Sequence, residues 1–175
     1  MRRRFVVPIR LVDLQVEKPL LARIISSSFY LSHGIRGDVV LYFYLMDHPK
    51  SVSFNGERLK HVHVDEASLV GILQKIERNI KTGSKKERIH DGVTIEDTPS
   101  LGEKTTLLVS NQGIPLERIA SRTINDFTYL IPLNNSWRIS PDKFTKIRVT
   151  YRPKPADVTI AILNIKLDRL TSSPL

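Results

Sequence analysis

Residues Val39–Leu45 constrain the fold most, because valine, leucine, tyrosine and phenylalanine follow one another there without a charged residue. A strand of this composition is typical of the centre of a parallel sheet that is covered on both faces. A short apolar run at residues 5–9 predicts another strand, and an apolar stripe over residues 19–32 predicts a helix that ends at Gly34. This order of elements indicates an α/β protein with a mainly parallel sheet and helices on both faces.

The rest of the chain continues the alternation with short connections. Asn55-Gly56 predicts a hairpin turn, since both residues tolerate positive φ, and Asp65 is the expected cap of a helix over residues 66–81. Further strands are expected at residues 93–95, 106–109, 127–131 and 147–150, with short helices at 117–122 and 140–146. A last helix is expected at 156–169, with Val158, Ile162 and Ile165 facing inward and Ala161 and Leu163 as further candidates for the inward face. No linker divides the 175 residues, so we expect one domain over residues 1–175.

The charge balance favours a polyanionic partner. Lysine and arginine exceed aspartate and glutamate by 27 to 18, which gives a net charge of +9. Such a surplus favours RNA binding through phosphate contacts, although a basic surface without a partner is the open alternative. The densest basic stretch that the sequence indicates is residues 75–90, which supplies the candidate RNA contacts Lys75, Arg78, Lys85 and Lys86.

Several classes of protein are disfavoured. The chain has no cysteine, which excludes disulfides and cysteine-ligated zinc. No apolar stretch approaches the roughly 20 residues of a membrane span, and Pro8 cuts short the run after residues 2–4, so we expect a cytoplasmic protein without a membrane partner. His61 and His63 lack a nearby carboxylate cluster, and we therefore predict no metal site.

The best polar constellation lies in the turn before Val39, where His33, Arg36 and Asp38 are expected at the mouth of the sheet. Arg36 can hold a phosphate with two hydrogen bonds, and Asp38 can orient Arg36 or handle a proton. In the structural alternative, Arg36 and Asp38 pair with each other to close the turn while His33 caps the helix. The residues alone leave both interpretations open.

The Ser-His-Gly-Ile-Arg-Gly-Asp stretch at residues 32–38 resembles the TrmY family of archaeal tRNA pseudouridine-54 N1-methyltransferases, which are SPOUT enzymes. A second matching stretch lies in the last helix and consists of Asn164, Leu167, Asp168 and Arg169. The resemblance implies a SPOUT-like fold with a C-terminal trefoil knot, a homodimer, and S-adenosylmethionine-dependent N1-methylation of pseudouridine in the tRNA T-loop. Two alternatives stay open, namely a non-enzymatic RNA-binding relative and a methyltransferase that acts on ribosomal RNA pseudouridine.

The resemblance also implies the roles of individual residues. Asp38 and Arg36 become the catalytic candidates, and His33 and Arg152 join the candidate RNA contacts named above. Three loops, at residues 110–115, 131–137 and 151–157, are expected to hold S-adenosylmethionine, largely through backbone groups. The candidate cofactor residues are Ser110, Leu130, Ile131, Pro132, Leu133, Asn134, Val149, Tyr151, Ala156 and Asp157. Three positions depart from the family pattern, because Gly34 replaces an acidic residue, Pro132 stands where a glycine is usual, and Leu163 stands where a histidine usually precedes the asparagine.

Overall fold

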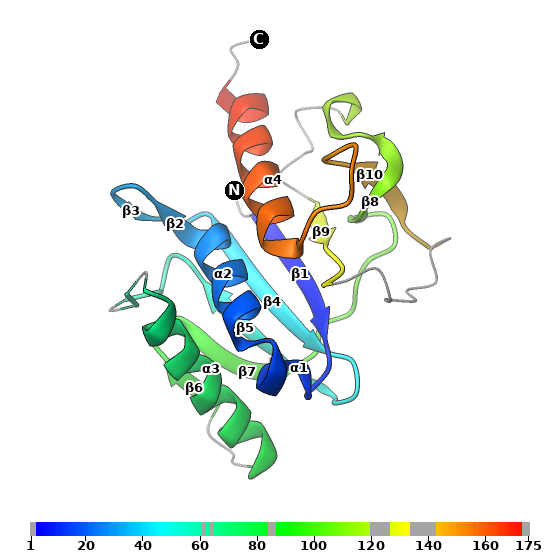
Figure 1. Ribbon diagram of the computed structural model, residues 1–175. Helices are drawn as coiled ribbons and strands as arrows, with labels where there is room; N and C mark the ends of the chain where they lie inside the picture. The colour runs from blue at the N-terminus through cyan, green and yellow to red at the C-terminus, as the bar shows by residue number, and fades with distance from the viewer. Residues whose placement is uncertain are drawn as a thin grey trace.

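The computed structural model describes residues 3–60, 62–63, 65–83, 87–119, 127–133 and 143–172 (Figure 1). Within these ranges eight strands form one sheet in the order β10-β8-β9-β1-β4-β5-β7-β6. Their bounds are β1 Arg3–Ile9, β4 Val39–Leu45, β5 Lys50–Asn55, β6 Arg88–His90, β7 Val93–Asp97, β8 Thr106–Pro115, β9 Thr128–Leu130 and β10 Thr145–Arg148. No helix of the described residues is long and apolar enough to cross a membrane.

The sheet has a parallel part and an antiparallel part. All neighbours from β10 to β4 run parallel, and β1 pairs with β4 from Arg3–Val39 to Ile9–Leu45. The three pairs from β4 to β6 are antiparallel. The apolar run Val39–Leu45 therefore forms a central strand, and the expected α/β class with a mainly parallel sheet is confirmed.

The helices lie together on one face of the sheet (Figure 1). They are α1 Asp13–Val16, α2 Lys18–Phe29, α3 Glu66–Lys81 and α4 Ala156–Ser172, with a 3₁₀ turn, η1, at Leu116–Arg118. Because side chains alternate along a strand, Phe5, Val7 and Ile9 pack under these helices while Val6 faces the opposite side. On that side Val6 packs with Tyr44, Leu108 and Leu130 rather than with a described helix, which corrects the expectation of helices on both faces for the described part of the chain.

The end of α2 differs from the sequence prediction. The helix stops at Phe29 because β2 (Tyr30–Leu31) and β3 (Gly34–Ile35) pair as a short hairpin, and the Arg36 amide donates to the Phe29 carbonyl at 2.6 Å. Gly34 is thus a strand residue and not the helix stop. The predicted start of α3 is confirmed, since the Asp65 carboxylate accepts a hydrogen bond of 2.8 Å from the Ser68 amide.

One turn prediction and one helix prediction need correction. Asn55-Gly56 ends β5 instead of joining two paired strands, since β5 pairs with β4 and β7. Gly56 is required there by close packing, because a Cβ built on it would lie 1.9 Å from the Arg36 carbonyl oxygen. Residues 145–146 belong to strand β10, because they pair with Leu107 and Leu108, and are not the end of a helix. Residues 120–122 and 140–142 of the two predicted short helices lie outside the described residues.

Helix α4 covers the predicted residues but turns a different face to the core. Its buried side chains include Ile160, Leu163 and Leu167, whereas Val158 and Ile165, which were expected inside, are exposed. Apolar residues occur on several sides of this helix, and periodicity alone therefore did not identify the buried side.

Candidate active site

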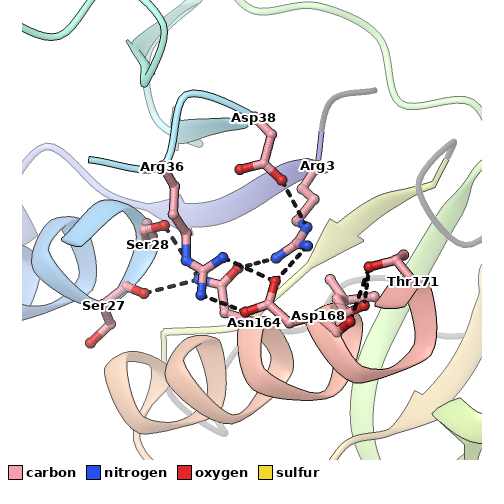
Figure 2. A network of polar contacts seen from close by, with 9 residues as sticks. Arg3, Ser27, Ser28, Arg36, Asp38, Asn164, Asp168 and Thr171 are labelled. Carbon is pink, nitrogen blue, oxygen red and sulfur yellow. Dashed lines mark hydrogen bonds and ion pairs between the residues drawn. The ribbon is translucent and has the colours of Figure 1, made fainter. Parts of the chain in front are cut away.

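Arg3 is the centre of a polar network beside the C-terminal half of α4 (Figure 2). Its side chain is only 7% exposed. The guanidinium Nε lies 3.2 Å from Asp38 Oδ2, Nη2 lies 2.7 Å from Asp168 Oδ1, and Nη1 donates to Asn164 Oδ1 at 3.2 Å. The network therefore joins the first strand, the turn before β4 and the last helix.

Arg36 binds the same carboxylate from the other side. Its Nη1 and Nη2 donate to the two oxygens of Asp168 at 3.0 and 2.7 Å, which is the bidentate geometry that guanidinium groups favour. Arg36 thus pairs with Asp168, and Asp38 pairs with Arg3, so the predicted alternative of an Arg36–Asp38 pair is wrong. Asn164 completes the network by donating from Nδ2 to the carbonyl oxygens of Ser27 and Ser28.

The two arginines determine the charge state of Asp168. Burial acts to raise the pKa of this carboxyl group, but the hydrogen bonds and positive charges of Arg36 and Arg3 outweigh burial and lower the pKa below its usual range. Two guanidinium groups and two carboxylates then balance in charge. The side chains of Asp38 and Asp168 are exposed to a similar degree, 43% and 39%, but Asp38 pairs with one arginine whereas Asp168 pairs with two.

The other candidate RNA contacts lie apart from this network. His33 is exposed in the β2–β3 turn and does not cap α2, which ends at Phe29. Lys75 and Arg78 are exposed on α3, close in sequence to Glu77, which pairs with Lys18 at the start of α2. Arg36 contacts the other end of α2, and the twelve residues of this helix separate its two ends by about 18 Å. Lys85 and Lys86 lie outside the described residues.

The candidate cofactor residues from 130 to 133 and at 149 and 151 lie at or after the carboxyl ends of β9 and β10, and Ala156 and Asp157 begin α4. Ile131, Leu133, Val149 and Ala156 are buried in the main core, whereas Leu130 faces the opposite side of the sheet. Pro132 is half-buried, and Asn134 lies outside the described residues.

The first of the three expected loops lies within strand β8, Thr106–Pro115. Its pairing with β10 is irregular, because Leu108 pairs with Lys146 and Ile114 pairs with Ile147, which leaves residues 109–113 without β10 partners in the register. Gly113 allows the close approach there, because a Cβ on it would lie 2.4 Å from the Ile147 carbonyl carbon. Ser110 belongs to this irregular part of β8, and its role in cofactor binding stays a prediction.

Asp157, in the first turn of α4, has a buried carboxylate oxygen without a hydrogen-bond partner among the described residues. Its Oδ2 pairs with Arg23 Nε at 3.1 Å, but no described residue gives Oδ1 a hydrogen bond. Buried carboxylate oxygens normally have partners, so this atom is suited to accept from an amino or hydroxyl group of a bound molecule. The chemistry of these residues fits S-adenosylmethionine, because Asp157 Oδ1 can accept from its amino group or ribose and the apolar side chains of Ile131, Leu133 and Val149 suit its adenine.

The two halves of the predicted site do not meet within one chain. Asp38 lies at the amino end of β4, whereas Ile131 and Val149 follow the carboxyl ends of β9 and β10, which run parallel to β4. Helix α4 connects the two ends, from Ala156 to Asp168, a distance of about 18 Å at the usual rise per residue.

Sequence reasoning missed Arg3 and did not select Asn164 or Asp168 as site residues. A signal for Arg3 is present, because it alternates with Phe5, Val7 and Ile9 and therefore shares their buried face. The partners of Arg3 could not be inferred in the same way, since Asp168 is 165 positions away in the sequence.

Comparisons with known proteins agree with this architecture. Residues 15–110, more than half of the chain, match the family described as "Putative SAM-dependent RNA methyltransferase". Two curated relatives bear the name tRNA (pseudouridine(54)-N(1))-methyltransferase. The one from Thermococcus onnurineus is 26% identical, covering 89% of this chain and 85% of its own, and the one from Thermococcus kodakarensis is 30% identical, covering 85% and 84%.

A solved structure shows the same fold. The crystal structure of Archaeoglobus fulgidus Nep1 bound to S-adenosylhomocysteine matches with a TM-score of 0.65, covering 99% of this chain and all of that one, at 10% sequence identity. The chain belongs to the family of SAM-dependent RNA methyltransferases.

Proposed function

We propose that this protein methylates N1 of pseudouridine at position 54 in the T-loop of tRNA, with S-adenosylmethionine as the methyl donor. One observation carries the family assignment behind the proposal: the two stretches that resemble the TrmY family, far apart in sequence, meet in the network of Arg36, Asp38, Asn164 and Asp168. The names of the two Thermococcus relatives support the choice of target nucleotide.

Different residues of this chain are proposed to bind the cofactor and to act on the substrate. S-adenosylmethionine, when bound, supplies an electrophilic methyl group on its sulfur. Ile131, Leu133, Val149 and Ala156 would enclose it, and Asp157 Oδ1 would accept one of its hydrogen bonds. A pseudouridine flipped out of its loop presents the N1–H group, which must lose its proton as the new bond forms.

Asp38 is the proposed acceptor of that proton. Its exposed carboxylate is oriented by Arg3, whose guanidinium fixes one of its oxygens at 3.2 Å. Arg36 would hold the phosphate beside the target pseudouridine, and its guanidinium would then donate both to that phosphate and to Asp168. Because the network already holds these groups in place, positioning would supply much of the catalysis.

The separation of about 18 Å within one chain supports a homodimer. Val158 and Ile165 form an exposed apolar strip on α4, next to the half-buried Ile162. If two α4 helices pack on this strip in opposite directions, the cofactor end of one protomer approaches the Arg36 and Asp38 of its partner. The proposal includes the C-terminal trefoil knot of SPOUT enzymes and action in the cytoplasm, where tRNA is available.

Two measurements test the proposal. Calorimetry with S-adenosylmethionine should give binding heat, and mass spectrometry of tRNA should show one added methyl group on a transcript with pseudouridine at position 54 and none on the same transcript with uridine. Absence of cofactor binding would support the non-enzymatic RNA-binding alternative, which the departure at Pro132 favours. Methylation of ribosomal RNA pseudouridine in place of the tRNA would refute the proposed target.

A further inference from the structure

Tyr151 is exposed to an unusual degree for an aromatic side chain. The residue is 84% exposed and lies between the end of β10 and the start of α4. The Arg148 guanidinium carbon lies 4.6 Å from the centroid of its ring, within the range of a cation–π interaction. This contact holds one face of the ring and leaves the other free to receive a planar group.

The surroundings of Tyr151 are strongly basic. Residues 143–155 include five lysines and arginines and no aspartate or glutamate, and Arg152 and Lys154 are exposed beside the ring. The nearby carboxylates have their own cations, since Glu117 pairs with Lys166 and Asp157 pairs with Arg23. Pro153 and Pro155 restrict the backbone that carries these side chains.

An exposed ring within a basic segment matches the chemistry of single-stranded nucleic acid. Such sites combine aromatic side chains, on which bases stack, with cations that follow the phosphates. A second copy of this chain, which carries a net charge of +9, offers less charge complementarity than RNA.

We propose that Tyr151 is a stacking platform for an unpaired base of the RNA substrate, while Arg152 and Lys154 contact the flanking phosphates. This inference rests on the proposed function and deepens it, since it moves Tyr151 from the cofactor site to the RNA site. Val149 and Ala156, which flank this segment, belong to the proposed cofactor wall, and the stacked base is therefore a neighbour of the methylated nucleotide.

The test measures binding of an RNA hairpin with the T-arm sequence by fluorescence anisotropy over a range of salt concentrations. Tyr151→Ala should weaken binding by about 5- to 150-fold, the effect expected for loss of one base–aromatic stack, and Tyr151→Phe should keep the affinity. Because the tyrosine is uncharged, Tyr151→Ala should leave the log–log salt slope unchanged. Arg152→Ala should reduce the slope by about 0.7, and the control Lys104→Ala, an exposed lysine outside this segment, should change neither quantity.

Other results would overturn the inference. Wild-type RNA affinity in Tyr151→Ala, or an equal loss on a fully paired duplex, would exclude base stacking. Loss of S-adenosylhomocysteine binding with RNA affinity intact would return Tyr151 to the cofactor site, and dissociation of a dimer would make it an interface residue. The assay requires no methyl transfer, so a wild-type protein that methylates nothing but binds RNA through Tyr151 would refute only the proposed function.

Discussion

Replacing Asp168 by asparagine tests whether the network of Figure 2 holds the fold together. The carboxylate accepts two hydrogen bonds from Arg36 and forms an ion pair with Arg3, and both arginine side chains are largely buried. An asparagine has nearly the same shape, but its amide nitrogen would face guanidinium donors. The two arginines would then lose their shared counter-charge.

The expected magnitude follows from burial. Removing one partner of a buried ion pair costs about 3–5 kcal/mol, because the remaining charge is left without compensation. Asp168 is itself 39% exposed, so water replaces part of the lost interaction, and we expect a loss of about 2–3 kcal/mol. For a domain of this size the melting temperature should fall by about 4–12 °C.

Asp97→Asn is the matched control, because Asp97 pairs with Lys50 at a similar distance of 2.7 Å but is 89% exposed. Its removal should cost much less than the removal of Asp168, because exposed ion pairs contribute little to stability. Calorimetric melting of wild type and both variants makes the comparison. Equal melting temperatures for Asp168→Asn and Asp97→Asn would refute the structural role of the network.

Three further predictions concern chemistry, pH and assembly. Asp38→Asn should lower methyl-transfer turnover by about 100- to 10,000-fold with little change in RNA affinity. Single-turnover assays measure the first quantity and fluorescence anisotropy the second, and unchanged turnover would remove Asp38 from the mechanism. Hydrogen bonds from Lys18 and Lys81 lower the pKa of Glu77 to about 2, so its contribution to stability is complete above its ordinary pKa of 4.5 and disappears as the pH falls toward 2. Urea denaturation between pH 5 and 2 should therefore show a smaller pH-dependent loss of stability for Glu77→Gln than for wild type, and identical profiles would contradict this account. Ile165→Asp should produce a monomer in sedimentation velocity if the α4 strip is the dimer interface, and an unaltered sedimentation coefficient would exclude that interface.

The sequence indicated the fold class because its strongest patterns depend on local physics. Val39–Leu45 could only be a central strand, and the Asp65 cap marks the start of α3. Predictions failed where tertiary contacts decide. Ile114 and Pro115 belong to a strand because they pair with β10 after a register shift, and the inward face of α4 depends on its neighbours more than on its own composition.

The same distinction applies to the site. Arg36 and Asp38 were identified because polar residues stand before a buried strand, but their actual partners, Asp168 and Arg3, lie at the two ends of the sequence. Only the packing of α4 beside α2 and over β1 brings these ends together. A pairing across such a sequence separation leaves no local pattern to find.

The ion pairs of the network change what the motif at residues 32–38 implies about activity. Arg36 and Asp38 both have structural partners, so a relative without cofactor binding would still lose stability if either residue were replaced. Presence of the motif is therefore expected for the enzyme and for the non-enzymatic alternative alike. The two alternatives give Asp157 Oδ1 different expectations, because a bound cofactor would donate a hydrogen bond to this oxygen in the enzyme and would be absent from the non-enzymatic relative.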